Sequence, residues 1–522
     1  MHPDIPERFN AAVYFVDRNL QAGRGDKIAV WHEDRCHTYR DIAGLVNRWG
    51  NVLRGLGVEP EQRIALLCLD SPEFIAGFLG AIRVGVVPIP LNTLLRPADY
   101  EGLLTDSRAR ALLVHETLWE PLAHIRHRCR DLRHVVVIGG GPHGFLEYDE
   151  LMRQAGEKCE PAETSRDDVA FWLYSSGSTG APKGTVHLQH DMVCCAASMG
   201  GAVLGLTGDD ITFSAAKLFF AYGLGNNLYF PFSVGASAVL YPGRPLAEAI
   251  FEVIQRHRPT VFYGVPTLYG TMLHVAERRA EAEGLAAVRD LLRPVRCCVS
   301  AGEPLPPAIF HRWKDLFGLE ILDGIGSTEM LQTFISNRPG RVRPGSSGEV
   351  VPGYAARIVD EEGRDVPPGE VGNLLVKGDS AAAFYWNRHQ QSKQAFLGEW
   401  VRTGDRYSQD ADGYFWYAGR SDDMLKVGGI WVSPIEVEHA LLSHPAVLEC
   451  AVVGAHDRDH MVKPRAYIVL KDGIQPSAEC ATQLQAFVKE VIAPFKYPRW
   501  IDFVSELPKT ATGKIQRFKL RG

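Results

Sequence analysis

The sequence predicts an α/β protein in which a large N-terminal body of β-α-β subdomains is followed by a small α+β domain. Short apolar runs alternate with segments of helical periodicity through most of the chain, and the order of elements changes past about residue 420. A chain of 522 residues is also too long for one compact hydrophobic core. We therefore predict a large domain at residues 1–420 and a small domain at residues 421–522.

Two β-α-β units are readable in the large domain. Residues 63–70 (RIALLCLD) form a predicted buried strand, a Ser-Pro pair then starts a helix, and VGVVPIP returns as extended chain. In the second unit, residues 295–300 (VRCCVS) form a strand, residues 306–317 have helical spacing, and Gly318 is a C-cap before LEILDG resumes a strand. The segments SAGE and DGIGSTEM thus follow two strands at the edge where open α/β sheets bind ligands.

The small domain has a different order of elements. The segment SPIE at residues 433–436 is a predicted capping box that starts a helix. The strands VLECAVVG and RAYIVL, a helix within residues 478–492 and a strand near WIDFV follow it. The charged, glycine-flanked segment at residues 419–429 is the predicted joint between the two domains.

Composition and charge exclude several classes of function. Hydrophobic residues make up 46% of the chain, charged residues 23%, and the formal net charge is -6, which argues against nucleic acid as a partner. The N-terminal segment lacks a signal-peptide pattern, and no apolar run is long enough to cross a membrane. The ten cysteines include no C-x-x-C pair, which argues against a disulfide framework or a zinc site. We expect a cytoplasmic protein.

A phosphate-binding loop is predicted at residues 174–184 (YSSGSTGAPKG). It lacks the spacing of a Walker A loop and that of a G-x-S-x-G nucleophile elbow. Its Ser, Gly and Thr residues nevertheless offer hydroxyl and backbone N–H donors, and Lys183 adds a cation suited to phosphate. A flexible surface linker is the alternative interpretation. The strand-like residues 169–174 (VAFWLY) lead directly into the loop and favour the phosphate site.

Further motifs follow along the chain. They are SAGEPLPP (300–307), DGIGSTEM (323–330), VRTGDRY (401–407), YAGRSDDMLKVGG (417–429) and PKTATGKIQR (508–517). With the loop, this set resembles the adenylate-forming superfamily of acyl-CoA synthetases, luciferases and nonribosomal peptide adenylation domains. The segments AAKLFFAYGLGN (215–226) and DGIGSTEML (323–331) resemble its benzoate–CoA ligase branch. The resemblance implies the adenylate-forming enzyme fold and an ATP-dependent aryl acid–CoA ligase, which makes an aryl adenylate and then a CoA thioester.

The resemblance also implies which residues bind the nucleotide. Asp405 would accept hydrogen bonds from the ribose hydroxyls, Arg420 would contact the ribose and phosphate region, and Glu329 would bind Mg²⁺. Many family members have an aromatic residue where this chain has Ile325, so apolar contact replaces stacking on the adenine. The implied nucleotide-binding set is Ser175, Ser176, Gly177, Ser178, Thr179, Gly180, Lys183, Ala301, Gly302, Glu303, Asp323, Gly324, Ile325, Thr328, Asp405, Arg420 and Lys514.

The same resemblance assigns catalysis and CoA binding. A carboxylate and a triphosphate are both anions, so the first half-reaction needs positive charge between them. Lys514 would bridge the acid and the α-phosphate. Asp422 matches the hinge about which the small domain turns, after which Gly428 and Gly429 would face the pantetheine thiol of CoA. The implied catalytic residues are Lys514, Thr328 and Lys183.

An aryl pocket follows from the same branch. Its implied lining is Ala221, Tyr222, Gly264, Gly326, Gln332 and Thr333. Benzoate relatives typically carry His and a bulky aliphatic residue at the last two positions, so this chain gains space and hydrogen-bonding capacity there. We expect these polar groups to meet a polar partner, which favours a substituted ring, 2-aminobenzoate (anthranilate) before a hydroxybenzoate. A benzoate–CoA ligase proper stays open as an alternative.

Two other functions stay open. An aryl-adenylating enzyme could load a separate carrier protein in place of CoA. A nucleotide-binding regulator without catalysis would lack motif residues, but Lys183, Thr328, Glu329, Asp405, Arg420 and Lys514 are all present. The expected partners are therefore a small aromatic carboxylic acid, ATP and CoA.

Overall fold

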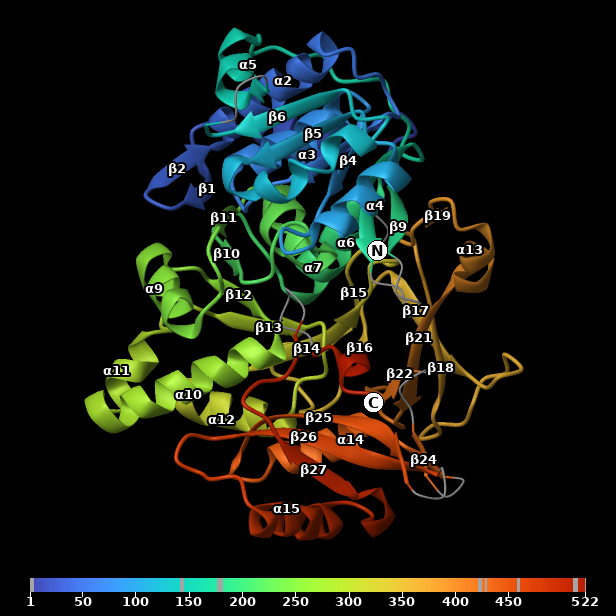
Figure 1. The fold of residues 1–522 in the computed structure, drawn as a ribbon. Helices are drawn as coiled ribbons and strands as arrows, with labels where there is room; N and C mark the ends of the chain where they lie inside the picture. The colour runs from blue at the N-terminus through green and yellow to red at the C-terminus, as the bar shows by residue number, and fades with distance from the viewer. Residues whose placement is uncertain are drawn as a thin grey trace.

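Two mainly parallel sheets, separated by a layer of helices, form the N-terminal body (Figure 1). An antiparallel sheet flanks them, and a small domain lies below. The structure describes residues 4–140, 145–175, 182–420, 425–427, 430–457, 461–509 and 515–521.

The first sheet is parallel throughout and contains the first predicted β-α-β unit. Helix α3 (Pro72–Arg83) starts with proline in its first turn, as predicted, and leads back to the sheet. Helices α2 (Tyr39–Gly55) and α4 (Pro97–Ser107) also pack against this unit. In spatial order its strands are β4 (Val87–Pro90), β3 (Arg63–Leu67), β5 (Ala111–His115), β6 (His134–Ile138) and β7 (Leu146–Glu147).

The second sheet has a parallel centre and antiparallel edges. Its strands are β16 (Glu349–Val350), β15 (Thr333–Ser336), β14 (Ile321–Gly326), β13 (Cys297–Ala301), β12 (Val261–Gly264), β10 (Ile211–Ser214), β11 (Ser237–Leu240), β1 (Ile28–His32) and β2 (Arg35–Thr38). One face is covered by α9 (Ala247–His257), α10 (Pro266–Glu283), α11 (Leu285–Asp290) and α12 (Pro307–Phe317).

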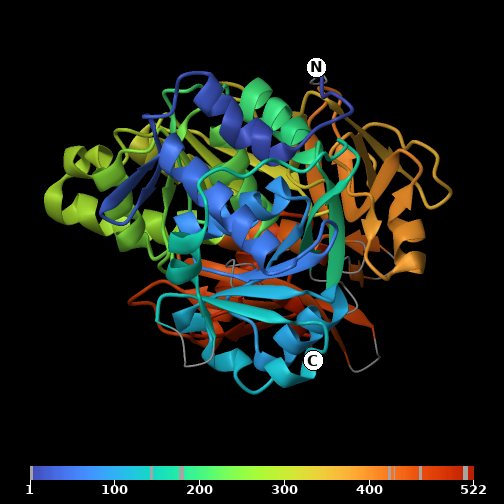
Figure 2. The same cartoon turned by 90° about the horizontal axis from the view of Figure 1, so that it is seen from above.

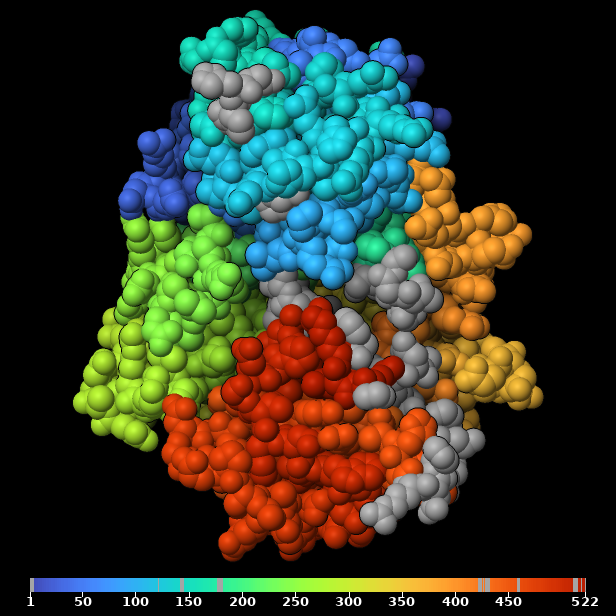
Figure 3. Space-filling view, in the orientation of Figure 1, coloured from blue at the N-terminus to red at the C-terminus, as the bar shows by residue number. Residues whose placement is uncertain are grey.

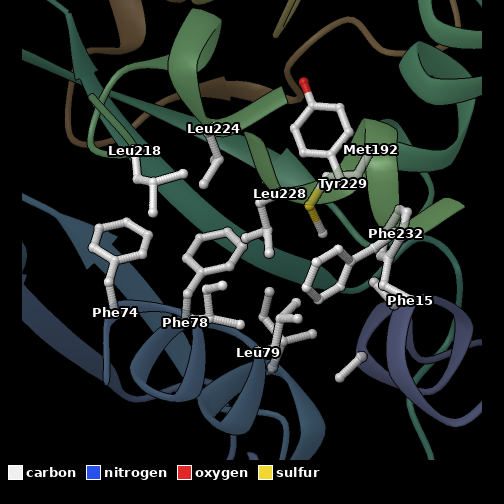
Figure 4. Packing of buried hydrophobic residues seen from close by; sticks show 14 of the residues in the cluster. Phe15, Phe74, Phe78, Leu79, Met192, Leu218, Leu224, Leu228, Tyr229 and Phe232 are labelled. Carbon is white, nitrogen blue, oxygen red and sulfur yellow. The ribbon is translucent and has the colours of Figure 1, made fainter. Parts of the chain in front are cut away.

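The main core fills the space between the two sheets. Alternate residues of β3 divide between two clusters, with Ile64 and Leu66 in the central core and their neighbours on the opposite face. Phe74 and Phe78 of α3 point across this core toward three leucines from residues 218–228 (Figure 4). Those labelled leucines are Leu218, Leu224 and Leu228, the last in η6 (Gly225–Tyr229).

Two further sets of strands complete the large domain. Strands β8 (Val169–Ser175) and β9 (Lys183–Leu188) are antiparallel, and β9 also pairs with β19 (Phe384–Tyr385). The flanking sheet contains β17 (Tyr354–Val359), β18 (Gly372–Gly378), β20 (Phe396–Leu397), β21 (Trp400–Gln409) and β22 (Phe415–Arg420). Seen from above, this orange sheet and the yellow-green helices lie on opposite sides of the molecule (Figure 2).

The C-terminal domain follows the predicted order. After the hairpin β23 (Leu425–Val427) and β24 (Ile430–Val432) come α14 (Pro434–Leu442), β25 (Val447–His456), β26 (Val462–Leu470), α15 (Ala478–Val491) and β27 (Trp500–Phe503). The red and orange residues of this domain lie against the lower face of the large body (Figure 3).

Most predicted elements are confirmed, with one local correction. Helix α12 ends at Gly318, which has the left-handed φ of 72° that a glycine C-cap allows. Only half of the predicted SPIE capping box forms: Ser433 Oγ accepts from Glu436 N, but the Glu436 carboxylate binds Lys496 Nζ at 2.6 and 2.7 Å. The lysine charge competes successfully for that carboxylate. No helix in the described residues is long and apolar enough to cross a membrane.

Truncating the central core should be costly. Because Phe78 is fully buried, Phe78→Ala should lower the free energy of unfolding by roughly 3–5 kcal/mol through lost burial and a residual cavity. Leu246→Ala is the control, since Leu246 is 64% exposed, and it should cost under about 0.5 kcal/mol. Urea unfolding of both variants measures the difference. Similar losses would contradict the assignment of Phe78 to the main core.

Candidate active site

The carboxyl ends of β12, β13 and β14 bring two motifs together. In the parallel register, Gly264 lies opposite Ser300, and Ala301 lies opposite Gly324. The SAGE and DGIG segments are therefore neighbours at one edge of the sheet, as predicted. Strand β15 turns back antiparallel, with Thr333 opposite Gly326, so the residues between β14 and β15 stand at the same edge.

Asp323 is buried beneath this edge. Its Oδ2 accepts a hydrogen bond of 3.2 Å from Leu305 N, while its Oδ1 has no partner within the described residues. Burial raises the pKa of Asp323 to about 8. The Asp323 side chain thus fixes the segment that follows Glu303. The backbone oxygen of Asp323 accepts hydrogen bonds from N and Nδ2 of Asn337.

The turn at Thr328 and Glu329 is held by residues from distant segments. His187 Nε2 donates to Thr328 O at 2.8 Å, and its Nδ1 lies 2.7 Å from Asp191 Oδ2. Tyr385 Oη donates to Glu329 Oε1 at 2.7 Å. Sequence reasoning missed His187, Asp191 and Tyr385, because each acts through pairing of strands and turns that no local pattern reveals.

Only the two ends of the predicted phosphate loop are described. Ser175 lies opposite Lys183 in the antiparallel pair β8–β9, so the loop leaves and returns at the same place. Lys183 Nζ lies 4.9 Å from the centre of the Tyr385 ring. The predicted phosphate-binding residues Ser176, Gly177, Ser178, Thr179 and Gly180 lie outside the described residues.

Asp405 and Arg420 form a pair across β21 and β22. They face each other in the antiparallel register, with Arg420 Nη1 3.3 Å from Asp405 Oδ1. Gly404 has a φ of 78°, and a Cβ there would lie 3.1 Å from Arg420 Nη2. Glycine is therefore required at this position both for the backbone and for the close approach of the guanidinium. The predicted TGD and AGR motifs meet directly.

The C-terminal domain touches the SAGE segment. Ile515 N donates to Glu303 Oε1 at 2.8 Å. Arg517 is anchored within its own domain by Glu438, with Nε 3.1 Å from Oε1 and Nη2 2.7 Å from Oε2. A cavity of about 580 Å³ separates other parts of the two domains and is lined by Trp416, Ile435 and their neighbours. The predicted residues Lys514, Asp422, Gly428 and Gly429 lie outside the described residues.

The aryl-pocket residues lie together, and their polar groups are paired within the chain. Gln332 Nε2 donates to Tyr222 O at 3.1 Å and to Asn226 Oδ1 at 3.4 Å. Gln332 Oε1 accepts from both N and Oγ1 of Thr333, each at 3.0 Å. The expectation that these side chains meet polar partners is confirmed, but the partners lie within the chain, so the polarity of Gln332 and Thr333 does not by itself require a polar ring substituent. Ala221 lies one residue before Tyr222 at the start of α7 (Ala221–Leu224).

The comparisons with known proteins give a consistent result. The AMP-binding enzyme family matches residues 16–386, and its C-terminal domain matches residues 436–514. A benzoate–CoA ligase of Thauera aromatica is 52% identical over 519 residues, covering 99% of this chain and 96% of the relative. The anthranilate CoA ligase AuaEII, solved with anthranoyl-AMP, has a TM-score of 0.94 and 47% identity, covering 99% of this chain and 97% of that one. A benzoate CoA ligase from Burkholderia xenovorans LB400 has a TM-score of 0.90 and 48% identity, covering 98% and 100%.

The buried Asp323 carboxyl should make stability depend on pH. Its pKa rises from 3.8 in the unfolded chain to about 8 on folding, so between these values the folded state holds a proton that the unfolded state has lost. The free energy of unfolding therefore falls as pH rises through this window, by at most roughly 1.4 kcal/mol per pH unit. Asp323→Asn should reduce the loss between pH 5 and pH 8, as measured by urea unfolding. An exposed control, Asp412→Asn, should keep the wild-type slope, and an unchanged slope in Asp323→Asn would contradict the assignment.

Proposed function

The chain belongs to the AMP-binding enzyme family of adenylate-forming enzymes, in the benzoate–CoA ligase branch, and on that premise we propose that it joins a benzoate-type acid to CoA. It is an AMP-forming acid–thiol ligase. The acid carboxylate attacks the α-phosphate of ATP and displaces pyrophosphate, giving an aryl adenylate. The CoA thiolate then attacks the acyl carbon and displaces AMP. The hydrogen bond from Ile515 N to Glu303 carries this proposal. It holds Ile515, the residue that directly follows Lys514 in the sequence, against the SAGE segment.

Adenylation, the first half-reaction, requires positive charge around the phosphates of ATP. Lys183, at the end of the phosphate loop, would neutralise the leaving pyrophosphate, and Lys514 would stabilise charge that develops at the α-phosphate. Arg420 adds a third cation, already oriented by Asp405. The position of Arg420 fits this role. It is the last residue of β22, lies opposite Asp405, and is close enough to Tyr385, the partner of Glu329, to counteract part of the rise in the Tyr385 pKa.

The nucleotide would lie along the carboxyl edge of the sheet. Ala301, Gly302 and Glu303 would border the adenine together with Gly324 and Ile325, as the parallel register places these segments side by side. Asp405, only 7% exposed, would accept from the ribose hydroxyls. Ser175, Thr328 and the loop residues outside the described part of the chain would hold the phosphates.

Mg²⁺ fits the donor set at the turn. Tyr385 occupies Glu329 Oε1, and Glu329 Oε2 makes no hydrogen bond within the described residues. Mg²⁺ is commonly bound by one or two carboxylates, substrate phosphates and waters, so one protein oxygen is sufficient here. The ion would neutralise phosphate charge when bound with ATP.

Two half-reactions would use two orientations of the small domain. We place the boundary between residues 1–420 and 421–522, with the hinge at Asp422. The contact between Ile515 and Glu303 belongs to the orientation suited to adenylation. Rotation about the hinge would break this contact and bring Gly428 and Gly429 to the pantetheine thiol of CoA.

The hydrogen bonding around Gln332 narrows the choice of acid. Because the hydrogens of Gln332 Nε2 and Thr333 Oγ1 are already donated, a hydroxyl at ring position 3 or 4 would receive no hydrogen bond from these side chains and would give up donors in water, a loss of roughly 1–3 kcal/mol. An amino group at position 2 donates to its own carboxyl oxygen and needs only space. We therefore propose benzoate and 2-aminobenzoate as the acids, with the smaller Thr333 leaving room for the amino group.

A substrate comparison tests this proposal. Benzoate and 2-aminobenzoate should each give a kcat/KM roughly tenfold or more above 3-hydroxybenzoate and 4-hydroxybenzoate in CoA thioester formation, because Gln332 and Thr333 have no donor left for the hydroxyls. Offering CoA against a phosphopantetheinyl carrier protein in the same assay tests the acceptor. A preference for a 3- or 4-hydroxy acid, or for the carrier, would contradict the respective part of the proposal.

Separating the half-reactions tests the cations and the domain contact. Lys514→Ala should abolish most acid-dependent pyrophosphate exchange, while thioester formation from supplied benzoyl adenylate should fall by less than about threefold. Glu303→Ala should impair the same exchange about 10- to 100-fold, since it removes a hydrogen bond to a charged acceptor worth roughly 1.5–3 kcal/mol. Glu320→Ala serves as the control, because Glu320 precedes β14 at its amino end, away from the carboxyl edge, where it binds Lys314. Equal damage to both half-reactions would contradict the assigned roles.

A further inference from the structure

One side chain connects the phosphate loop to the Thr328–Glu329 turn. Tyr385 is 5% exposed, and its hydroxyl donates to Glu329 Oε1 at 2.7 Å. The Lys183 ammonium lies 4.9 Å from the centre of the same ring. We infer that Tyr385 is a positioning residue for adenylation, which orients the Glu329 carboxylate for the cation and holds the Lys183 ammonium toward phosphate. This inference rests on the proposed function.

Tyr385 is well placed for this because its backbone is fixed to the strand that carries Lys183. In the antiparallel pair β9–β19, Tyr385 lies opposite Thr185. Trp386 N donates to Gly184 O at 2.8 Å, and Ala383 N donates to Val186 O at 2.9 Å. The distance between the Tyr385 ring and Lys183 is therefore set by a strand pair and not by a loop.

The same segment is also fixed to the turn. Ala382 N donates to Glu329 O at 2.7 Å, so backbone and side chain of Glu329 are both held from residues 382–385. Tyr385 N donates to Ser392 Oγ at 3.0 Å, and the Phe396 ring packs 5.2 Å from the Tyr385 ring. These contacts leave the Tyr385 ring one well-defined position.

The chemistry of the two contacts is complementary. Burial and the neighbouring Glu329 carboxylate raise the pKa of the Tyr385 hydroxyl well above its usual range, so this hydroxyl remains a donor at every working pH. It engages Oε1 and leaves Oε2 for a cation. The ring face attracts the Lys183 ammonium without using its N–H donors, which stay available for phosphate oxygens.

Two substitutions separate the contacts. Tyr385→Phe removes the hydroxyl and keeps the ring, whereas Tyr385→Leu removes both. Tyr39→Phe is the matched control, since Tyr39 is also fully buried and donates to a carbonyl, Ala236 O at 2.6 Å, away from the site. The readouts are Mn²⁺ binding in the presence of ATP by electron paramagnetic resonance, ATP binding without metal by calorimetry, and the midpoint of thermal unfolding.

Tyr385→Phe should weaken Mn²⁺ binding in the ATP complex about tenfold and leave metal-free ATP affinity within twofold of wild type. Tyr385→Leu should weaken both about tenfold. In both variants, thioester formation from supplied benzoyl adenylate should stay within threefold of wild type, and Tyr39→Phe should change neither binding constant. Wild-type Mn²⁺ binding by Tyr385→Phe would overturn the inference, as would equal losses in Tyr39→Phe. The binding measurements need no aryl acid, so they test the role of Tyr385 independently of the substrate. If wild-type pyrophosphate exchange responded to no aryl acid, that result would overturn the proposed function and not this inference.

Discussion

The parallel pairing of β12, β13 and β14 is the constraint on which the rest of the site depends. Since the strands run in one direction, their last residues end at one edge, and the antiparallel return into β15 holds the Thr328–Glu329 turn at the same edge. Segments from elsewhere then dock on that edge. Strand β9 reaches it through His187, β19 through Tyr385, and the C-terminal domain through Ile515 on Glu303.

Charged groups around the site are held in pairs whose members come from different elements. Arg420 is oriented by Asp405 across two strands, and Arg517 is oriented by Glu438 of α14. His187 lies between Asp191 and a carbonyl in a fully buried position. Pairing reduces the cost of burying each charge and fixes the direction of each donor. Donors fixed before the reaction need little reorganisation when charge develops on the α-phosphate, which is where such a site gains most of its rate.

The sequence was sufficient to predict features that depend on neighbouring residues. It was insufficient for features that depend on packing between distant segments. Helix α12 with its Gly318 cap, and the order of elements in the small domain, follow from spacing and turn residues within a few positions. Tyr385 and His187 could not be found in this way, because their roles arise only when β19 pairs with β9 and β9 meets the turn. The need of Gln332 for polar partners could be predicted, but not which partners it has, since Tyr222 and Asn226 belong to a helical segment packed from elsewhere.

Within the described residues, the boundary between the two domains is only partly packed, and the proposed two half-reactions would depend on that. The cavity of about 580 Å³ leaves part of the boundary unpacked. The contact between His274 Nε2 and Asp472 Oδ2 crosses it at 3.4 Å, but the carboxylate is 82% exposed, so this contact contributes at most about 1 kcal/mol. The hydrogen bond from Ile515 to Glu303 adds roughly 1.5–3 kcal/mol. These two contacts together would favour this orientation by about 2.5–4 kcal/mol. In the proposed mechanism, the other orientation would then be populated at between about one part in seventy and one part in nine hundred, whereas a boundary packed throughout would hinder transfer to CoA.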